Sequence, residues 1–523
     1  MVNVDVSNSA LQRFGRESIR RTFIISCLII EGVLVDKPAE MFDRDYEWSE
    51  LTRFVRYPGA EATLGVVSGR RRQGKTFLLD AICRAAGGFY FAATEATEAE
   101  SLHQFGAALA RHLGEPVPRR FARWDEAVET LMTVAGSGPT PVVIDEFPYL
   151  VKASPQLPSL IQRALGPQGR RQGGAVRLLL CGSALSFMGA LLAGTAPLRG
   201  RASLELVVPT LDYRQARDFW GISDPALALL VNAVVGGTPA YRREFTLGDV
   251  PGGIDDFGPW VVRNVLNPGR PLFREARFLL AEEPELRDTA LYHGVLSAVA
   301  DGNHTRGGIA GYLGRKSTDL SHALTALEDV GMIAREADAF HGKRSAYRIT
   351  EPILGFYHAI MRPEWTDLER PGYAEQVWER SQAAFRSKVL GPHFEHLARV
   401  WTRWHAGPET LGGLRTRVAS GVLPDPAAKT GHELDVVVFG RTEDGREAIL
   451  AIGEAKYGDV VGQGHLERLE RLRELLVRRD DRARSGVRLL LFSAAGFVPG
   501  LQEIAQGRDD LQLVGLDRLY EGS

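Results

Sequence analysis

The octapeptide Gly69-Arg70-Arg71-Arg72-Gln73-Gly74-Lys75-Thr76 decides the fold. An apolar, β-rich run over 62–67 precedes it, and a helical pattern begins at Thr76, so strand, loop and helix follow in that order. Glycine at both ends lets the backbone wrap closely around phosphates, with amide hydrogens and the helix N-terminus facing the anion. The octapeptide is therefore predicted to bind a nucleotide.

The two residues that end the octapeptide carry the most specific chemistry. Lys75 places a positive charge at the β and γ phosphates, and the hydroxyl of Thr76 is predicted to bind Mg²⁺. The expected cofactors are ATP and Mg²⁺. The candidate cofactor-binding residues in the loop are Gly69, Arg70, Arg71, Arg72, Gln73, Gly74, Lys75 and Thr76.

Polar side chains end two further apolar runs. Residues 141–144 run into Asp145-Glu146, where Asp145 is expected to hold Mg²⁺ through water and Glu146 to polarise the attacking water as a catalytic residue. Residues 176–181 run into Gly182-Ser183, where Ser183 could sense the γ-phosphate, the alternative being a plain turn from strand to helix.

Two arginines, Arg199 and Arg201, precede the apolar run 204–208. An arginine can neutralise charge on a transferring phosphate, in its own subunit or across an interface. Both are therefore candidate cofactor-binding residues. The alternative is that they are two surface arginines.

The octapeptide, Ile144-Asp145-Glu146-Phe147, Gly182-Ser183 and the later Gly236-Gly237-Thr238-Pro239-Ala240-Tyr241 together resemble the archaeal-type ATPases of the AAA+ and STAND branch of P-loop proteins. The resemblance covers about residues 41–285. It implies an α/β fold, with a five-stranded parallel sheet covered by helices on both faces over 41–220. A helical lid over 221–285 is implied to contain Gly236 to Tyr241.

Residues 286–360 are predicted to form a winged helix, which the resembled family carries at this place. An apolar helix around 309–313, a polar turn and a helix over 319–330 outline a helix-turn-helix, and the segment from 330 to 349 reads as a strand-turn-strand wing. The predicted recognition helix has few cations. Cations lie at its approach and in the wing, so DNA contact and a packing role both stay open. These cations are Arg315, Lys316, Lys343 and Arg344.

A carboxylate and lysine cluster is predicted in the C-terminal part. A strand over 432–438 contains Asp435, and a second strand, 448–452, runs into Glu454-Ala455-Lys456. Strand periodicity puts Glu454 and Lys456 on one side, and hairpin pairing brings Asp435 beside them. The carboxylates can bind Mg²⁺, and Lys456 can activate water or stabilise a pentavalent phosphate.

This spacing, with the upstream helical Glu395 as a further candidate metal ligand, resembles the PD-(D/E)xK nuclease superfamily over 380–523. The resemblance implies an α/β nuclease-like domain with Asp435, Glu454 and Lys456 as catalytic residues. Leu434 stands where that family has proline, which weakens the match. An isolated Glu-x-Lys would be surface charge, and such folds also persist with a binding role only.

Bulk composition limits location and partners. The 63 basic and 65 acidic residues nearly balance, so nucleic acid would have to meet a local patch. Three separated cysteines fit a reducing cytoplasm. Residues 1–40 are an uncertain N-terminal extension in which Arg20-Arg21 precedes an apolar run too short to span a membrane, so neither export nor a membrane partner is expected. Met41 is an alternative start.

Two hypotheses of function follow. In the first, a cytoplasmic ATPase controls a C-terminal metal-dependent nuclease or nucleic-acid-binding module through the winged helix. In the second, the chain is a signalling switch of the STAND kind that assembles with copies of itself according to its nucleotide, and its C-terminal domain is a catalytically silent docking surface. A third hypothesis, which rests on the predicted winged helix alone, is a transcription regulator.

Overall fold

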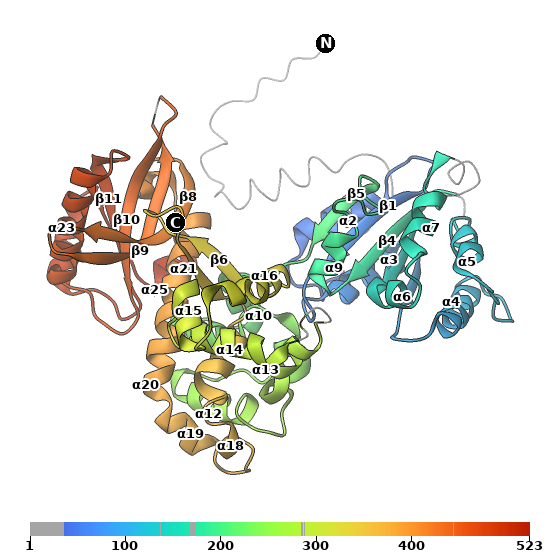
Figure 1. Cartoon of the computed structure of the whole chain (residues 1–523), viewed down its shortest axis with the longest axis horizontal. Coiled ribbons are helices and arrows are strands. Elements are labelled where there is room, and N and C mark those ends of the chain that lie inside the picture. Colours follow the sequence, from blue (N-terminus) through green and yellow to red (C-terminus); the bar gives the residue numbers. More distant parts are fainter. Residues whose placement is uncertain (1–35, 136–137, 168–173, 284–285, 287, 443) are drawn as a thin grey trace, which may run out of the picture.

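The structure is a computed structural model that describes residues 36–523 apart from 136–137, 168–173, 284–285, 287 and 443. It has two five-stranded sheets at opposite ends, with a largely helical part between them (Figure 1). Most of the predicted N-terminal extension, including Arg20-Arg21, lies outside the described residues.

The N-terminal sheet is parallel throughout and has the order β2-β3-β4-β1-β5. This confirms the predicted parallel α/β fold. Its central strands are buried on both faces, which is why their sequences are almost continuously apolar. The strands are β1 (Thr63–Ser68), β2 (Phe89–Ala92), β3 (Thr140–Asp145), β4 (Val176–Gly182) and β5 (Ala202–Val207).

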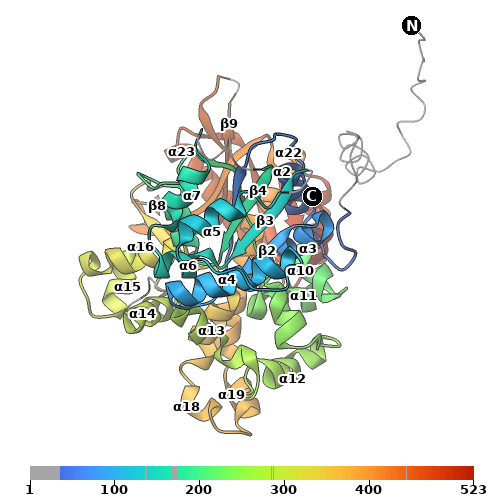
Figure 2. The ribbon, with the colours of Figure 1, turned by 90° about the vertical axis from the view of Figure 1, so that its right-hand side faces the viewer.

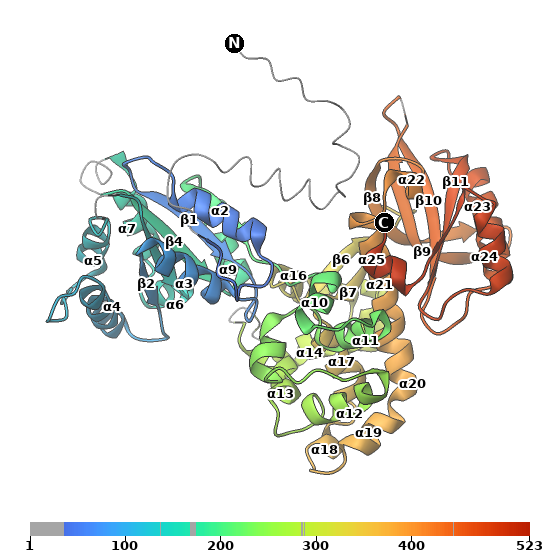
Figure 3. The ribbon, with the colours of Figure 1, turned by 180° about the vertical axis from the view of Figure 1, so that it is seen from behind.

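Helices cover both faces of this sheet. On one face α2 (Asp45–Val55) and α3 (Lys75–Ala86) bury their apolar sides, and Figure 3 shows α2 beside β1. The other face is covered by the helices between β2 and β5, of which α4 also flanks the edge strand β2 (Figure 2). These helices are α4 (Glu98–His112), α5 (Trp124–Leu131), α6 (Phe147–Ala153), α7 (Leu157–Ala164) and α9 (Leu185–Ala190).

The middle of the chain begins with the helices of the predicted lid. After these come three helices and an antiparallel pair of strands, in the order predicted for 286–360. The predicted recognition helix is shorter than expected, because its first turn is the 3₁₀ segment η2 (Ser317–Leu320). The elements are α10 (Tyr213–Trp220), α11 (Pro225–Val235), η1 (Tyr241–Phe245), α12 (Ile254–Asn264), α13 (Pro271–Ala281), α14 (Thr289–Ala300), α15 (Arg306–Tyr312), α16 (Ser321–Asp329), β6 (Ile333–Ala337) and β7 (Ser345–Ile349).

One apolar core runs through the whole middle part. It extends from Leu211 to Leu411 and also takes in Leu519 and Tyr520 near the C-terminus. The lid helices therefore share their core with the segment that follows them. The elements after β7 are α17 (Pro352–Phe356), η3 (Tyr357–Met361), α18 (Trp365–Leu368), α19 (Ala374–Arg380), α20 (Gln382–Ala384), η4 (Phe385–Leu390), α21 (Gly391–Trp404) and α22 (Pro408–Leu411).

The C-terminal sheet is mixed and has the order β12-β11-β10-β9-β8. Strands β8 to β10 are antiparallel, and β10 to β12 are parallel. One face packs against α21, and the other buries the apolar side of α23. The elements are β8 (Arg415–Asp425), β9 (Thr430–Arg441), β10 (Glu447–Lys456), α23 (Gln463–Arg479), β11 (Ala483–Ser493), α24 (Pro499–Gln506), β12 (Leu511–Val514) and α25 (Leu516–Glu521).

Within the described residues, no single helix has the length and apolarity needed to cross a membrane. One sharply bent pair, α10 with α11, passes that test on length and composition only.

Candidate functional site

The backbone of the octapeptide leaves no room for side chains at its first glycine. Gly69 has a φ of +152°, and a Cβ there would lie 2.5 Å from the carbonyl oxygen of Val208. Gly74 has a φ of +86° and is the residue before α3, so the helix begins directly after a left-handed turn. Lys75 and Thr76 therefore lie in the first turn of α3, at the positive end of the helix dipole.

The predicted Mg²⁺ ligands lie together. The hydroxyl of Thr76 donates to Oδ2 of Asp145 over 2.8 Å. The hydroxyl of Tyr90, on β2, donates to the same oxygen over 2.6 Å, and the amide of Glu146 donates to Oδ1 over 2.9 Å. Asp145, the last residue of β3, is therefore held through both of its carboxylate oxygens. It lies beside the hydroxyl of Thr76 in the first turn of α3, where the positive end of the helix favours an anion. This donor set fits a Mg²⁺ ion that is also bound to a nucleotide.

Ser183 and Glu146, which the sequence predicts at the ends of two different strands, lie together. Strand β4 lies between β1 and β3, so its end places Ser183 between the phosphate loop and the carboxylate pair. The hydroxyl of Ser183 is 3.3 Å from both carboxylate oxygens of Glu146 and accepts a hydrogen bond from Nε of Arg71, also over 3.3 Å. The backbone of Glu146 is left-handed, with a φ of +50°. Strained backbone of this kind is typical of functional sites.

Lys75 is buried, and its ammonium donates to the carbonyl oxygen of Arg70 over 2.8 Å. Burial lowers the pKa of Lys75, while the charges of Glu146 and Asp145 oppose that shift. A phosphate placed at the ammonium would supply further negative charge and favour its charged form.

A cavity of about 780 Å³ opens beside these residues. Lys75, Thr76, Glu146, Ser183 and Arg71 line it. Apolar residues from the start of the described chain and from the helical part after the sheet line the same cavity, which suits a nucleobase. These are Met41, Phe42, Phe219, Pro239 and Ala240. The predicted Gly236 to Tyr241 segment touches the loop directly, because the amide of Ala240 donates to the carbonyl oxygen of Arg72 over 3.4 Å.

The three arginines of the octapeptide all form ion pairs with acidic residues outside the loop, and Arg72 also lies 3.7 Å from Glu282. Arg70 pairs with Glu351, just after β7, over 2.9 Å. Arg71 pairs with Glu282, at the end of α13, over 3.3 Å. Arg72 pairs with the fully buried Glu275 of α13, which also accepts from the hydroxyl of Tyr241 over 2.9 Å. The phosphate loop is thus tied by ion pairs to the lid and to the segment after the β6–β7 hairpin.

Arg199 and Arg201 are not brought to this cavity, so they are not phosphate contacts within their own subunit. Both are exposed, and Arg199 donates to the carbonyl oxygen of Gly194 over 2.6 Å. They precede β5, which runs parallel to β1 and pairs Ala202 with Leu64 at the start of β1. The phosphate loop follows the end of β1, so the two arginines lie at the opposite edge of the sheet. A role across a subunit interface stays a prediction.

The C-terminal cluster also forms, but within a strand. Glu454 and Lys456 lie inside β10 rather than after it, and the ammonium of Lys456 is 2.9 Å from Oε1 of Glu454. Asp435 on β9 accepts from the amide of Ala455 over 2.8 Å, which places it between them. A guanidinium nitrogen of Arg468 on α23 is 2.5 Å from Oε2 of Glu454.

Burial and charge shift the pKa values in this cluster. Burial, followed by the neighbouring Asp435, raises the pKa of Glu395 to about 7. Burial also raises the pKa of Asp435, against the opposing hydrogen bond from Ala455. Although burial lowers it, the bond to Glu454 leaves the pKa of Lys456 raised overall. Among the residues that the structure describes, no three His, Cys, Asp or Glu side chains form a group that could hold a metal ion.

Several site residues were not predicted from the sequence. Nothing in the sequence marks Tyr90 as a site residue, because tyrosine is common in strands. The sequence does mark Glu275, because this charged residue lies at helical spacing with Leu272 and Leu279, where an apolar residue is expected. Arg468 is one of many arginines on α23, and only the fold distinguishes it.

Comparisons with known proteins give partial matches. No protein-family model matches the chain. It is 26% identical to the uncharacterized protein MJECL04 of Methanocaldococcus jannaschii over 341 residues, which is 64% of this chain and 71% of that protein. The Walker-type ATPase paby2304 of Pyrococcus abyssi is similar in structure with a TM-score of 0.45 and 19% identity, over 62% of this chain and 99% of that one. The ORC2 protein of Aeropyrum pernix has a TM-score of 0.40 and 15% identity, over 67% of this chain and 98% of that one.

Proposed function

We propose that the chain binds ATP with Mg²⁺ and hydrolyses it. The observation that carries this proposal is the contact between the hydroxyl of Thr76 and the buried carboxylate of Asp145. Thr76 lines the same cavity as Lys75, Glu146 and Ser183. Thr76 and Asp145 would hold Mg²⁺, and the ion would supply positive charge to the phosphates. Lys75 would bind the β and γ phosphates, Glu146 would orient and polarise the attacking water, and Ser183 would bind the γ-phosphate.

The test is release of phosphate from ATP by the wild type and by Lys75→Ala and Glu146→Gln. Lys75→Ala should lose nucleotide binding, measured with a fluorescent ADP analogue, because its ammonium contacts the phosphates. Glu146→Gln should keep binding and lose turnover. The proposal fails if Lys75→Ala hydrolyses ATP as fast as the wild type.

We further propose that the nucleotide state is transmitted to a nucleic-acid-binding or nuclease site at Glu395, Asp435, Glu454 and Lys456. A set of contacts supports this. Arg70 of the phosphate loop pairs with Glu351, which closely follows β7. Arg348 on β7 donates to Glu336 on β6 over 2.9 Å.

The contacts continue from the hairpin to the C-terminal cluster. Glu336 is 3.7 Å from Arg399 on α21. Arg399 donates to the carbonyl oxygen of Asp435 over 3.2 Å, and its charge opposes the rise in the pKa of Glu395. Two sets of contacts therefore lie between Arg70 and the carboxylates, and the short segment from Arg348 to Glu351 joins them through the backbone. Such an arrangement can carry coupling between sites.

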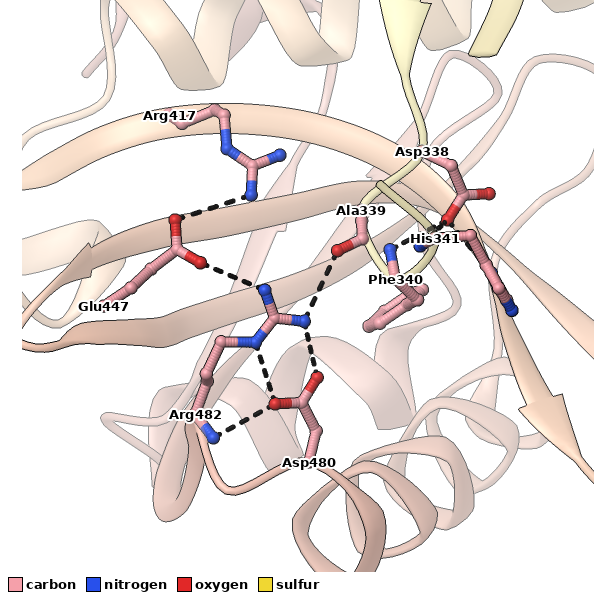
Figure 4. Close-up of polar contacts among 8 residues, drawn as sticks. All are labelled: Asp338, Ala339, Phe340, His341, Arg417, Glu447, Asp480 and Arg482. Carbon is pink, nitrogen blue, oxygen red and sulfur yellow. Dashed lines mark hydrogen bonds and ion pairs between the residues drawn. The ribbon is translucent and has the colours of Figure 1, made fainter. Parts of the chain in front are cut away.

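The turn of the hairpin is also fixed to the C-terminal sheet (Figure 4). The amide of Ala339 donates to the carbonyl oxygen of Ser420 on β8 over 2.9 Å, and Arg482 donates to the carbonyl oxygen of Ala339 over 3.5 Å. Arg482 is itself held by Glu447 over 3.0 Å and by Asp480 over 2.7 Å. Ala339 and Phe340 join the apolar core of the C-terminal domain. The hairpin and this sheet would therefore move together.

A nucleic acid is the partner we propose for the exposed cations of the middle and C-terminal parts. Arg315, Lys316, Lys343 and Arg344 are exposed around α15, α16 and the hairpin turn, and α23 adds Arg471, Arg478 and Arg479. Such cations attract phosphates without reading sequence. The winged-helix role of residues 286–360 belongs to this proposal.

The nuclease proposal is tested by incubating labelled DNA and RNA with Mg²⁺ or Mn²⁺, with and without ATP. Wild type, Lys456→Ala and Lys75→Ala are compared, with Lys429→Ala, an exposed lysine in the β8–β9 turn, as the control. Cleavage should disappear in Lys456→Ala and should lose its response to ATP in Lys75→Ala. Cleavage that is indifferent to Lys456→Ala would refute the assignment.

A second candidate function is a STAND-type signalling switch with a silent C-terminal domain. The observation that favours it is that both oxygens of Glu454 already face cations, Lys456 and Arg468. Molecular mass in solution, measured with ADP and with a non-hydrolysed ATP analogue, separates the two. Assembly that depends on the nucleotide, without cleavage of any strand, would support the switch.

A further inference from the structure

The side chain of Arg71 lines the proposed nucleotide cavity together with Lys75, Thr76 and Ser183. Its Nε donates to the hydroxyl of Ser183 over 3.3 Å, and a terminal nitrogen donates to the hydroxyl of Tyr149 over 3.1 Å. Glu146, the proposed water-polarising residue, is 3.3 Å from the same Ser183 hydroxyl. Arg71 and Glu146 therefore approach one point from two sides.

No other candidate arginine of the sequence analysis is placed this way. Arg70 faces Glu351 and does not line the nucleotide cavity, and Arg72 is committed to the buried Glu275. Arg199 and Arg201 lie at the opposite edge of the sheet, as described above. Arg72 also lines the cavity, but Arg71, whose side chain is 31% exposed, is the loop arginine that contacts Ser183 there.

We infer that Arg71 is the catalytic arginine of ATP hydrolysis and acts within its own chain, so that turnover needs no arginine from a second subunit. The inference rests on the proposed ATPase function and adds a residue and a subunit assignment to it. Arg71 already contacts Ser183, the residue proposed to bind the γ-phosphate, within one chain, so no second subunit has to supply an arginine there.

The chemical step assigns Arg71 an electrostatic role. The oxygen of water forms a bond to the γ-phosphorus while the bond to the bridging oxygen breaks, and that electron pair stays on the β-phosphate of ADP. The proton of water passes to Glu146 and then to the released phosphate. Arg71 donates hydrogen bonds to the γ-phosphoryl oxygens and gives up no proton, stabilising charge that is redistributed in the transition state.

The contact with Glu282 links this step to the lid. Glu282, at the end of α13, is 3.3 Å from Arg71, and its charge helps to raise the pKa of Arg71 against the effect of burial. A γ-phosphate at Arg71 would compete with that carboxylate and repel it. Occupation of the site by ATP, more than by ADP, would therefore loosen the end of α13 from the loop.

The test compares steady-state ATP hydrolysis by wild type, Arg71→Ala, Arg71→Lys and the double variant Arg199→Ala with Arg201→Ala. Arg120→Ala, an exposed arginine outside the cavity, is the matched control. Arg71→Ala should lower kcat by about 10²-fold or more with little change in KM, because removing one preorganised donor has this effect. Arg71→Lys should recover part of the loss, and the other two variants should keep the wild-type rate.

Two further measurements keep the outcome decisive. Binding of a fluorescent ADP analogue to Arg71→Ala shows that the variant is folded, and Arg71→Lys serves as the test variant if it is not. The rate per protein molecule should stay constant as the wild type is diluted, and mixing Arg71→Ala with Lys75→Ala should restore no activity.

Each contrary result overturns a defined claim. Equal rates for Arg71→Ala and wild type, or loss of activity in the Arg199 and Arg201 variant alone, overturn the role of Arg71. Activity restored by mixing overturns the claim that Arg71 acts within its own chain. If the wild-type protein binds nucleotide but releases no phosphate from ATP, the proposed hydrolysis itself is overturned, and the inference with it.

Discussion

Breaking the ion pair between Arg70 and Glu351 should loosen the phosphate loop and the segment after the hairpin together. The side chains are only 14% and 4% exposed, and the charges are 2.9 Å apart. Removing one partner of such a buried pair leaves an uncompensated charge and destabilises by about 3 to 5 kcal/mol. Replacing both by alanine should be less harmful than the two single changes added together.

The two single changes should also differ from each other. Both side chains line a cavity of about 690 Å³, but that of Glu351 is 4% exposed and that of Arg70 is 14% exposed. Arg70→Ala leaves the less exposed charge, Glu351, with the hydroxyl of Thr238 3.3 Å away, whereas Glu351→Ala leaves the more exposed Arg70, which water solvates more easily. We therefore expect Arg70→Ala to be the more destabilising of the two.

Hydrogen exchange in the native state measures this locally, without assuming that the whole chain unfolds in one step. The reporters are the amides of Leu354 and Gly355, which donate to the carbonyl oxygen of Glu351. A loss of 3 kcal/mol would speed their exchange by about 10²-fold. A matched cycle on the exposed pair Lys152 and Glu95 should show no coupling. Additive effects of Arg70→Ala and Glu351→Ala would refute the reasoning.

Three further predictions concern other parts of the molecule. Gly69→Ala should lower the melting temperature and the nucleotide affinity, because the added Cβ would overlap the carbonyl of Val208 and strained backbone costs about 1–3 kcal/mol. Gly311→Ala is the control: it lies in open space on α15 and should stabilise the protein by about 0.5–1 kcal/mol. The pKa of Glu395 is about 7 in the folded protein against 4.5 for the free side chain, so the free energy of unfolding should fall as pH rises between those values. Thermal unfolding followed by calorimetry across that range measures the slope. Glu395→Gln should remove it, and an unchanged slope would contradict the prediction. Phe340→Ala should free the hairpin turn and speed trypsin cleavage after Lys343, with equal cleavage of the wild type as the contrary result.

The sequence predicts which side chains of the proposed nucleotide site lie together, because the parts of that site are local. A strand, a glycine loop and a helix determine where Lys75 and Thr76 lie, and the ends of parallel strands bring Asp145 and Ser183 to the same edge. The same rule could have placed Arg199 and Arg201 correctly. Residues that precede a parallel strand lie at the edge opposite the site, whatever their charge.

Long-range contacts could not be predicted in this way. The bond from Tyr90 to Asp145 depends on β2 being the neighbour of β3, and the pairs made by Arg70, Arg71 and Arg72 depend on how the lid packs. The C-terminal cluster falls between these cases. Strand periodicity and hairpin pairing predict that Asp435, Glu454 and Lys456 lie together. The contact of Arg468 with Glu454 depends on how α23 packs on the sheet, which the sequence of α23 alone does not predict.

The return of the chain's last helix to the middle part has a consequence for synthesis on the ribosome. The hydroxyl of Tyr213, on α10, donates to the carbonyl oxygen of Leu519 over 2.6 Å, and the ring of Tyr213 packs against that of Tyr520. These partners are 306 positions apart in the chain. At typical rates of translation, the surface around Tyr213 stays uncovered for about 15 to 60 s after it emerges. During that interval the nascent chain presents an apolar surface to chaperones, and a ribosome that stalls before Leu519 leaves this surface without its cover.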